Sequence, residues 1–266
     1  KQLLPIYDKP MIYYPLSILM DAGIKEVLII STPEDLPNFE KLLGDGSKIG
    51  MKFNYIVQPK PEGLAQAFIL GENFIGDDNV CLILGDNVFY VNELNTLMKS
   101  AMSRLEHNAT IFGYYVNDPE RYGVATFDTN GNVTNIDEKP ENPESNYAIV
   151  GLYFYPNDVI KKAKELKPSA RGELEITAIN QLYLDEKRLN VELLHKNSTW
   201  LDTGTHSSLL EASQFIKTNE KRTGIKIACI EEIAFKKNFI SKYDLENIIK
   251  NMGNNEYAMY LKRIIE

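Results

Sequence analysis

The motif Gly85-Asp86-Asn87 has the clearest potential for chemistry in this sequence. It directly follows five apolar residues, 80–84, that are typical of a buried strand. A carboxylate at the carboxyl end of a central parallel strand is well placed to hold a divalent ion bound to phosphates. A glycine before it lets a ligand approach the backbone closely. The motif therefore predicts that Asp86 binds a metal ion, and the alternative is that it begins a turn or caps a helix.

A second aspartate, Asp202, stands in a polar loop after another expected strand. It occurs in "TWLDTGT" (199–205), between the only tryptophan and a glycine. Two carboxylates from distant parts of the chain that converge on one ion would suit a magnesium nucleotide site. We therefore predict Asp86 and Asp202 together as Mg²⁺ ligands. Alone, Asp202 would be read as a turn residue or as the N-cap of the helix that follows.

Two further stretches could bind parts of a nucleotide sugar. "NIDEKPENP" (135–143) places Glu138 beside Lys139 at a strand end, where an acceptor and a cation could hold sugar hydroxyls and a phosphate. The alternative is a solvated charged loop. "VQPKPEGLAQAF" (57–68) presents Gln58 from a loop stiffened by two prolines, with Gly63 opening a helix. Such a loop could read the edge of a base, or it could be an ordinary strand-to-helix connection.

Several well-known catalytic patterns are absent from the sequence. It has no GxxxxGK[ST] phosphate loop, no GxGxxG fingerprint and no GxSxG elbow. Cys81 lies in an apolar strand and is a poor candidate for a nucleophile. The three histidines, His107, His195 and His206, are scattered without metal-ligand spacing. The strand-end "GDN" therefore favours phosphate chemistry, although paired acids for glycoside hydrolysis stay open.

The elements that must position these residues alternate between strands and helices. Short apolar runs predict strands at 25–31, 52–58, 79–87 and 109–116, with amphipathic helical stretches between them. Continuously apolar strands separated by helices indicate a parallel sheet that is covered on both faces. Ligands of such sheets gather at the carboxyl ends of the strands.

The pattern changes in the middle of the chain. Asn130-Gly131, between two alternating runs in 122–140, predicts a β-hairpin. Residues 147–156 form a further apolar strand, and the chain from Ile225 onward is mostly helical in pattern. We expect one mixed α/β domain, with a mostly parallel sheet flanked by helices, a hairpin insertion and a helical C-terminal extension. The expected boundaries are 1–224 for the core and 225–266 for the extension.

Composition narrows the class of protein. The 266 residues contain 44% hydrophobic and 25% charged residues, which is ordinary for a globular protein. The net charge of −8 argues against a general nucleic-acid binder. No apolar run is long enough to cross a bilayer, and no secretory signal is visible. The two distant cysteines, Cys81 and Cys229, favour reduced thiols and a cytoplasmic protein.

Taken together, the sequence closely resembles the bacterial glucose-1-phosphate thymidylyltransferases, which are sugar-nucleotide pyrophosphorylases. The resemblance extends over essentially the whole chain in family order. It is carried by "KQLLPIYDKPMIYYPLSILMDAGIKEVLIIST", "VQPKPEGLAQAFILGENFIG", "LGDNVFY", "DPERYGVATFD", "EKPENPESNYAIVGLYFYP", "ARGELEITAINQLYL", "TWLDTGTHSSLLEAS" and "GIKIACIEEIAF". It implies a Rossmann-like nucleotidyltransferase fold. It also implies the Mg²⁺-dependent conversion of dTTP and glucose 1-phosphate into dTDP-glucose and pyrophosphate, an early step toward deoxysugars such as rhamnose.

The resemblance also assigns roles to individual residues. Asp86 and Asp202 would hold magnesium against the nucleotide phosphates, and Lys139 and Arg171 would bind the sugar phosphate. Glucose hydroxyls would be held by Glu138, Asn87 and the backbone at Gly123 and Val150. The thymine would be read by Gln58 and the backbone at Gly63, with Gln2 nearby, and Lys1 matches a lysine that contacts phosphate.

The family sequences carry a strand and a glycine-rich GGxGTRL loop ahead of the segment that begins here with Lys1. We therefore expect an N-terminal segment in the natural protein that supplies a central strand and wraps the triphosphate. Residues 225–266 resemble the helical region that helps to build a homotetramer and a second, regulatory nucleotide-sugar site. No nucleic-acid or membrane partner is expected.

Two alternatives stay open. Base choice rests on few contacts, so the chain could be a uridylyl- or cytidylyltransferase that acts on a sugar 1-phosphate. It could also be a non-catalytic regulatory protein that binds nucleotide sugars.

Overall fold

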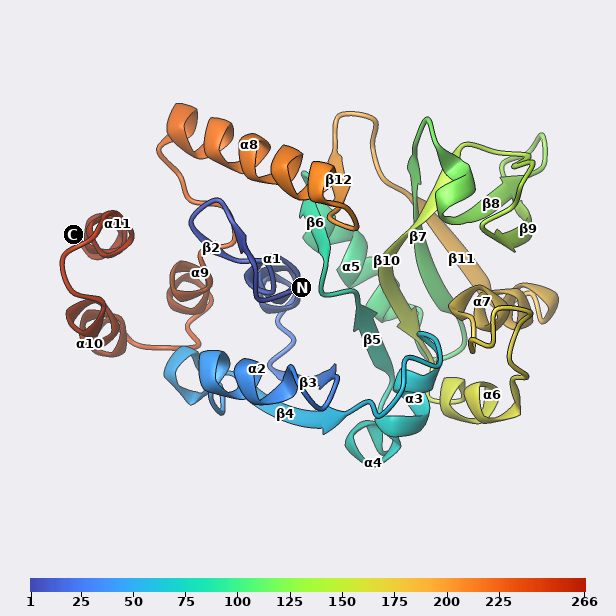
Figure 1. Ribbon diagram of the computed structural model, residues 1–266, viewed down its shortest axis with the longest axis horizontal. Coiled ribbons are helices and arrows are strands. Elements are labelled where there is room, and N and C mark those ends of the chain that lie inside the picture. Colours follow the sequence, from blue (N-terminus) through green and yellow to red (C-terminus); the bar gives the residue numbers. More distant parts are fainter. The chain divides into compact units, whose positions relative to one another are not determined.

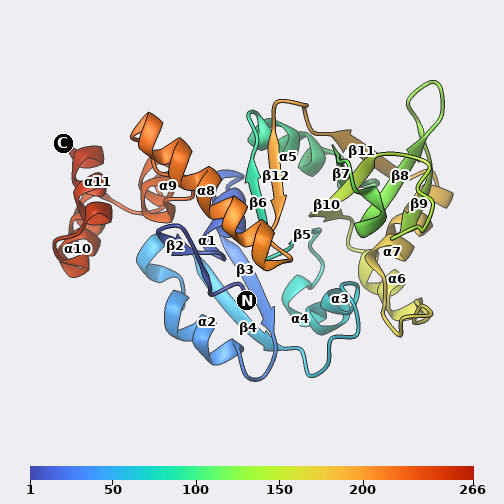
Figure 2. The same cartoon turned by 45° about the horizontal axis from the view of Figure 1, so that its top comes forward.

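The computed structural model describes residues 1–266, which form two compact units (Figures 1 and 2). The first unit comprises residues 1–57 and 202–266, and the second comprises residues 58–201. Both units combine helices with strands, so the expected mixed α/β class is confirmed. No helix is both long and apolar enough to span a membrane.

The first unit contains two small sheets and a set of helices from both ends of the chain. Strands β1 and β2 form an antiparallel hairpin, and β3 and β4 pair in parallel over their full length. The elements are β1 (Pro5–Ile6), β2 (Lys9–Pro10), α1 (Tyr13–Asp21), β3 (Glu26–Ser31), α2 (Leu36–Leu43), the 3-10 turn η1 (Ser47–Ile49), β4 (Lys52–Val57), α8 (His206–Thr223), α9 (Ile230–Lys236), α10 (Lys242–Met252) and α11 (Glu256–Ile265).

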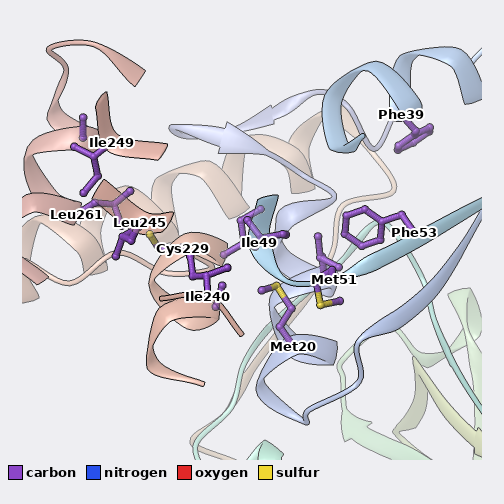
Figure 3. Close-up of a cluster of buried hydrophobic side chains, with 14 of the residues drawn as sticks. Met20, Phe39, Ile49, Met51, Phe53, Cys229, Ile240, Leu245, Ile249 and Leu261 are labelled. Atoms are coloured by element: carbon purple, nitrogen blue, oxygen red, sulfur yellow. The ribbon is translucent and has the colours of Figure 1, made fainter. Parts of the chain in front are cut away.

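The core of the first unit joins the early strands and helices to the last three helices. Met20 on α1 and Phe53 on β4 belong to the same buried cluster as Cys229, Leu245 and Leu261 (Figure 3). The helices α10 and α11 also pack against each other and against α9. Residues after 225 are helical, as the sequence pattern predicts, and they share a core with the first 57 residues.

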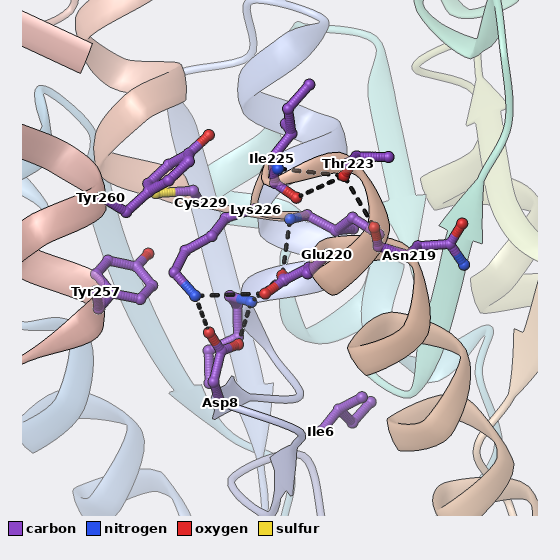
Figure 4. A network of polar contacts seen from close by, with 12 residues as sticks. Ile6, Asp8, Asn219, Glu220, Thr223, Ile225, Lys226, Cys229, Tyr257 and Tyr260 are labelled. Carbon is purple, nitrogen blue, oxygen red and sulfur yellow. Dashed lines mark hydrogen bonds and ion pairs between the residues drawn. The ribbon is translucent and has the colours of Figure 1, made fainter. Parts of the chain in front are cut away.

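A partly buried ionic network ties the β1–β2 hairpin to the end of α8 (Figure 4). The Lys9 ammonium is almost fully buried and donates to Glu220 Oε1 at 2.9 Å and to Asp8. Lys226 donates to Asp8 and to Glu220 Oε2, the latter at 3.3 Å. The backbone N–H of Ile227 also donates to Glu220. Two cations and two carboxylates thus neutralise each other, with Lys9 and Glu220 on the buried side of the network.

The second unit is built on a six-stranded sheet with helices packed against it. A separate short pair, β6 and β12, completes the strands, and β12 ends at the boundary with the first unit. The elements are α3 (Gln66–Leu70), α4 (Glu72–Ile75), β5 (Val80–Ile83), β6 (Asn87–Tyr90), α5 (Leu94–Ser103), β7 (Ala109–Tyr115), the 3-10 turn η2 (Pro119–Arg121), β8 (Gly123–Phe127), β9 (Val133–Glu138), β10 (Tyr147–Tyr155), α6 (Val159–Glu165), α7 (Ile176–Asp185), β11 (Leu189–Leu193) and β12 (Thr199–Asp202).

The six-stranded sheet is mixed, but its pairings are not mostly parallel as the sequence led us to expect. The order is β11-β7-β10-β8-β9, and β5 also pairs with β10. Only β11 and β7 pair in parallel, whereas β10 runs antiparallel to β5, β7 and β8, and β8 runs antiparallel to β9. A continuously apolar strand indicates burial on both faces, which is common in parallel sheets but does not by itself fix the direction of the neighbouring strands.

Strand β10 changes partners halfway along one edge. Ala148 pairs with β8, and from Leu152 onward the strand pairs with β5. The ladder with β7 on the opposite edge shifts register between Ile149 and Tyr153. Residues 149–151 therefore lie where the regular ladders are interrupted, a kind of irregularity that is common beside functional sites.

The hairpin predicted at 122–140 is confirmed by the antiparallel pair β8 and β9. Its turn is held by Asp128, whose Oδ1 accepts the N–H groups of Asn130 and Asn132 at 2.9 and 2.8 Å. Gly131 takes the left-handed conformation that this turn requires, with φ at +83°.

Candidate active site

Asp86 lies in a tight turn directly after β5, as the sequence predicts for a strand-end aspartate. The N–H of Leu84 donates to the Gly151 carbonyl on β10 at 2.9 Å, and the N–H of Asn87 closes the turn on the Leu84 carbonyl at 3.2 Å. The turn role that we considered as an alternative is therefore correct for the backbone of Asp86. The expected parallel setting is wrong, because β5 pairs antiparallel with β10.

Asn87 connects the Asp86 turn to two distant parts of the second unit. Its side chain is buried, and Oδ1 accepts the Gly151 N–H at 3.0 Å and the Trp200 indole N–H at 2.7 Å. Its Nδ2 donates to Asp86 Oδ1 at 3.2 Å. A Cβ at Gly151 would lie 2.7 Å from Asn87 Oδ1 and 2.6 Å from the Leu84 side chain, so only glycine fits there. Asn87 therefore holds the Asp86 turn in place, in addition to any contact with a ligand.

A second group of predicted residues comes together at the open end of the hairpin. Gly123 and Glu138 are direct cross-strand partners on β8 and β9. Lys139 follows with φ at +46°, a left-handed conformation that is uncommon for a lysine, and its N–H donates to the Tyr122 carbonyl at 3.0 Å. Its ammonium lies 3.9 Å from Glu138 Oε1. The backbone thus fixes a cation beside a carboxylate.

Arg171 joins this group from the segment before α7. Its guanidinium contacts Glu138 Oε1 at 3.2 Å, Glu173 Oε2 at 3.0 Å and Glu175 Oε1 at 3.8 Å. The hydrogen bond to Glu173 and the charges of Glu175, Glu173 and Glu138 raise the pKa of Arg171. The sequence did not single out Glu173 or Glu175, although the alternation of acids in "GELE" could have drawn attention to them.

The carboxyl of Glu138 has a raised pKa. Burial is the main cause, and the nearby Glu175 adds to it, while Lys139, Arg171 and a hydrogen bond with Thr177 act in the opposite direction. An anion that binds to Lys139 and Arg171 would add negative charge beside Glu138 and would raise its pKa further. Such a carboxyl is suited to hydrogen bonds with hydroxyl groups.

The loop that holds Gln58 and Gly63 packs against the same segment. Gly63 has φ at +104°, and a Cβ there would lie 2.4 Å from the Leu174 carbonyl oxygen. Helix α3 begins only at Gln66, so Gly63 precedes the helix and does not open it. The side chain of Gln58 donates from Nε2 to Gln66 Oε1 at 2.7 Å. The glycine is thus required by the contact between two backbone segments.

Val150 is fully buried on β10, within the stretch where the ladders are interrupted. Its backbone is next to Gly151 and therefore next to the Asn87 side chain. The structure thus brings together, in the second unit, Asp86 with Asn87 and the neighbouring Val150, and separately Gly123, Glu138, Lys139 and Arg171.

Lys1, Gln2 and Asp202 belong to the first unit. The carbonyl groups of Lys1 and Gln2 accept the N–H groups of Leu4 and Ile12, both at 2.9 Å. Asp202 is the last residue of β12. It does not cap α8, because the N-cap is Thr205, whose hydroxyl accepts the N–H of Ser208.

The donor set fits a magnesium ion that keeps water and phosphate ligands. No three His, Cys, Asp or Glu side chains gather as a protein-only metal cage. Asp86 presents a carboxylate on the turn after β5, and its Oδ1 accepts a hydrogen bond from Asn87 Nδ2 at 3.2 Å. Magnesium is usually bound by one or two carboxylates together with substrate phosphates, so a single carboxylate such as that of Asp86 is adequate in type.

A protein nucleophile is not apparent in the second unit. Burial raises the pKa of the Cys81 thiol strongly, and this keeps it protonated and unreactive. Sequence reasoning did not assign a role to Trp200. Its ring packs edge-on against Tyr114 and Tyr122, at centroid distances of 6.0 and 5.2 Å. Trp200 therefore connects the Asn87 turn to Tyr122, whose carbonyl accepts the Lys139 N–H.

Comparison with known proteins identifies the family. Residues 1–219 match the nucleotidyl transferase family. A glucose-1-phosphate thymidylyltransferase from Neisseria meningitidis serogroup A is 52% identical over 266 residues, covering 100% of this chain and 92% of that protein. One from Xanthomonas campestris pv. campestris (strain B100) is 53% identical over 261 residues, covering 98% and 88%.

A solved structure of a candidate glucose-1-phosphate thymidylyltransferase from Bacillus anthracis, in complex with a sucrose, is similar with a TM-score of 0.75 and 40% identity. The match covers 81% of this chain and 85% of that chain. The resemblance read from the sequence segments is confirmed. The chain belongs to the nucleotidyl transferase family and, within it, to the glucose-1-phosphate thymidylyltransferases.

Proposed function

We propose that this protein transfers a thymidylyl group from dTTP to glucose 1-phosphate and releases pyrophosphate. The observation that carries this proposal is the 52% identity with a glucose-1-phosphate thymidylyltransferase over all 266 residues. The product is dTDP-glucose, a precursor of deoxysugars such as rhamnose. The cluster of Lys139 and Arg171 beside Glu138 and Gly123 supports the same reaction, because it combines cations for a phosphate with acceptors for hydroxyl groups.

The reaction is an in-line displacement that needs no covalent enzyme intermediate. A phosphate oxygen of glucose 1-phosphate forms a bond to the α-phosphorus of dTTP. The bond between that phosphorus and the bridging oxygen to the β-phosphate breaks, and the electron pair leaves with pyrophosphate. Catalysis of this kind depends on positioning and on charge stabilisation. The strongly raised pKa of Cys81 agrees with a mechanism without a thiol nucleophile.

The chain's own residues have distinct tasks in this scheme. Lys139 and Arg171 bind the sugar phosphate and orient its attacking oxygen. Glu138 and the backbone at Gly123 and Val150 accept or donate hydrogen bonds to glucose hydroxyls, with Asn87 contributing through the remaining N–H of its amide. Lys1 contacts the nucleotide phosphates, and Gln2, Gln58 and the backbone at Gly63 contact the thymidine.

Asp86 and Asp202 are the proposed Mg²⁺ ligands. The ion neutralises charge on the triphosphate when it is bound. The turn held by Asn87 keeps the Asp86 carboxylate in position for it.

A pyrophosphate-release assay on the full-length protein tests the reaction. The protein is incubated with glucose 1-phosphate, Mg²⁺ and one of dTTP, UTP or CTP. We expect the highest kcat/KM with dTTP, and a strong preference for UTP or CTP would instead assign a uridylyl- or cytidylyltransferase. Nucleotide binding without turnover would favour the regulatory binding protein.

The site residues are tested by substitution. Asp86→Asn and Asp202→Asn should each strongly reduce Mg²⁺-dependent turnover, because each removes a charged ligand of the ion. Lys139→Ala should chiefly raise KM for glucose 1-phosphate, because a cation that faces its phosphate is lost. Lys161→Ala is a matched control on α6, where the lysine side chain is 80% exposed. Near-normal kinetics of the three site variants would remove support for these roles.

We further propose that the protein is a cytoplasmic homotetramer and that residues 225–266 contribute to its assembly and to a regulatory site for a dTDP-sugar. Light scattering coupled to size-exclusion chromatography measures the assembly. Kinetics with added dTDP-sugar, at fixed substrate concentrations, test the regulation.

A further inference from the structure

Three side chains of the 58–66 segment form a hydrogen-bonded relay. Gln58 donates from Nε2 to Gln66 Oε1 at 2.7 Å, and Gln66 donates from Nε2 to Glu62 Oε2, also at 2.7 Å. Gln66 is buried at the start of α3, with 9% of its surface exposed. A buried amide with both ends engaged has a single orientation.

The direction of this relay is set by the charge at its end. A carboxylate only accepts hydrogen bonds, so the amide nitrogen of Gln66 must face Glu62. The oxygen of Gln66 then faces Gln58, and Gln58 must present its nitrogen. This leaves Gln58 Oε1, for which no hydrogen bond within the chain is found, as the acceptor that Gln58 can offer to a ligand. The Glu62 carboxylate therefore decides whether Gln58 presents an acceptor or a donor.

The backbone around Glu62 holds the end of the relay in place. The Leu174 N–H donates to the Glu62 carbonyl at 2.7 Å, and the Glu62 N–H donates to the Lys60 carbonyl at 2.9 Å. On the other side of the close approach at Gly63, the Ala65 N–H donates to the Leu174 carbonyl at 3.1 Å. The segment is thus attached at both ends of its turn, and these bonds fix the backbone from which the Glu62 side chain reaches Gln66.

We propose that Glu62, acting through Gln66, fixes Gln58 with its oxygen toward the base and thereby selects against cytosine. This inference rests on the proposed function, in which Gln58 contacts the pyrimidine. Thymine and uracil carry a hydrogen on N3 that can donate to Gln58 Oε1. Cytosine carries a lone pair on N3, which would face the lone pairs of that oxygen. Thymine and uracil differ only in the methyl group on C5, which the relay does not contact. The relay should therefore distinguish bases only by the hydrogen on N3.

The variant Glu62→Lys tests the proposal by inverting the relay. An ammonium group donates, so Gln66 should turn its oxygen toward residue 62 and its nitrogen toward Gln58. Gln58 would then present its nitrogen to the base. We expect the ratio of kcat/KM for dCTP to that for dTTP to rise by roughly ten- to a hundredfold, the range that one exchanged hydrogen bond supplies. The ratio for dUTP to dTTP should stay within about twofold of the wild-type value, because both bases carry the N3 hydrogen.

Additional variants test whether the effect comes from the orientation of Gln58 or from a general change in the loop. Gln66→Leu cuts the relay and should also raise the dCTP to dTTP ratio, but less than Glu62→Lys, because Gln58 is then free to turn. Glu106→Lys makes the same charge change at a side chain that is 85% exposed and should leave the ratio unchanged. Calorimetric Kd values for dTMP, dUMP and dCMP provide the same ratios if a variant has lost turnover.

The outcomes distinguish this inference from the proposed function. A wild-type protein that forms no dTDP-glucose would contradict the proposed function itself. If the wild type is active, an unchanged dCTP to dTTP ratio in both Glu62→Lys and Gln66→Leu overturns the relay. An equal loss for all three nucleotides also overturns it, because the residues would then only support the loop.

Discussion

Removing the Asn87 side chain should destabilise the second unit. In Asn87→Ala, the Gly151 N–H and the Trp200 indole N–H would lose their shared acceptor in a buried setting. Leaving buried donors unsatisfied costs about 1–3 kcal/mol each. Trp200 is the only tryptophan of the chain, so its fluorescence during urea unfolding reports directly on this unit. For two donors we expect the free energy of unfolding to fall by about 2–6 kcal/mol.

The control for this prediction is Asn95→Ala. The Asn95 side-chain oxygen is buried without a partner, so its removal leaves no donor unsatisfied. If Asn87→Ala unfolds at the same urea concentration as the wild type, the Gly151 and Trp200 donors have found other partners.

Asn87 also shows what a sequence pattern can and cannot predict about a single residue. The pattern of an apolar run followed by "GDN" correctly located Asp86 and Asn87 at the end of a strand. The partners Gly151 and Trp200 lie 64 and 113 residues further along the chain, and their contacts depend on how β10 and β12 are placed. Spacing along the sequence contains no record of that placement, so the supporting role of Asn87 could not be predicted.

At the scale of elements, the cap of α10 offers a direct test of local stability. The Ser241 hydroxyl accepts the Asp244 N–H, and the Asp244 carboxylate accepts the Ser241 N–H, which forms a capping box. Helix α10 contributes Leu245 and Ile249 to the core of the first unit. Ser241→Ala should lower the free energy of unfolding by about 1 kcal/mol, because one of the helix's first N–H groups loses its acceptor.

Thermal unfolding followed by circular dichroism measures this effect. Ser241→Thr keeps a hydroxyl acceptor and should remain close to the wild type. An equal loss in both variants would point to packing around residue 241 and not to the cap.

Most elements could be predicted from the sequence, but their pairing could not. The strand patterns at 25–31, 52–58 and 109–116 correspond to β3, β4 and β7 within one or two residues. The predicted strand 79–87 is in fact two short strands, β5 and β6, with the Asp86 turn between them. Apolar content and turn residues are local signals, whereas the antiparallel position of β10 between β7, β8 and β5 depends on contacts between distant segments.

At the scale of the whole molecule, deletion of residues 225–266 should unfold the first unit. This segment supplies Cys229, Leu245 and Leu261 to the cluster that buries Met20 and Phe53. Their loss would expose the apolar faces of α1 and β4 to water, at about 25 cal/mol for each Å² of apolar surface. Hydrogen exchange followed by mass spectrometry should show loss of protection in β3 and β4. If β3 and β4 keep their protection from exchange, the C-terminal helices are not required for the stability of the first unit.

The ionic network around Asp8 makes the stability of the protein depend on pH. Burial alone would raise the pKa of Asp8, but hydrogen bonds from Lys226 and Lys9 and the charges of both lysines together lower it below the ordinary value of 3.8. A carboxyl whose pKa is lower in the folded state contributes stability above its unfolded pKa, and this contribution is lost as the pH falls through the folded pKa. We therefore expect a loss of stability below about pH 3.8.

The variant Asp8→Asn isolates this contribution. Asparagine cannot neutralise Lys9 and Lys226, which would then face only Glu220, so the free energy of unfolding at pH 6 should fall by about 1.5–3 kcal/mol. The difference from wild type should shrink as the pH falls below 3.8, because the wild-type carboxyl is then protonated as well. Urea titrations between pH 2.5 and 7 measure both effects, with Glu34→Gln on the surface of the same unit as the control. A difference that stays constant across this range would show that Asp8 stabilises the hairpin by packing, and not by its charge.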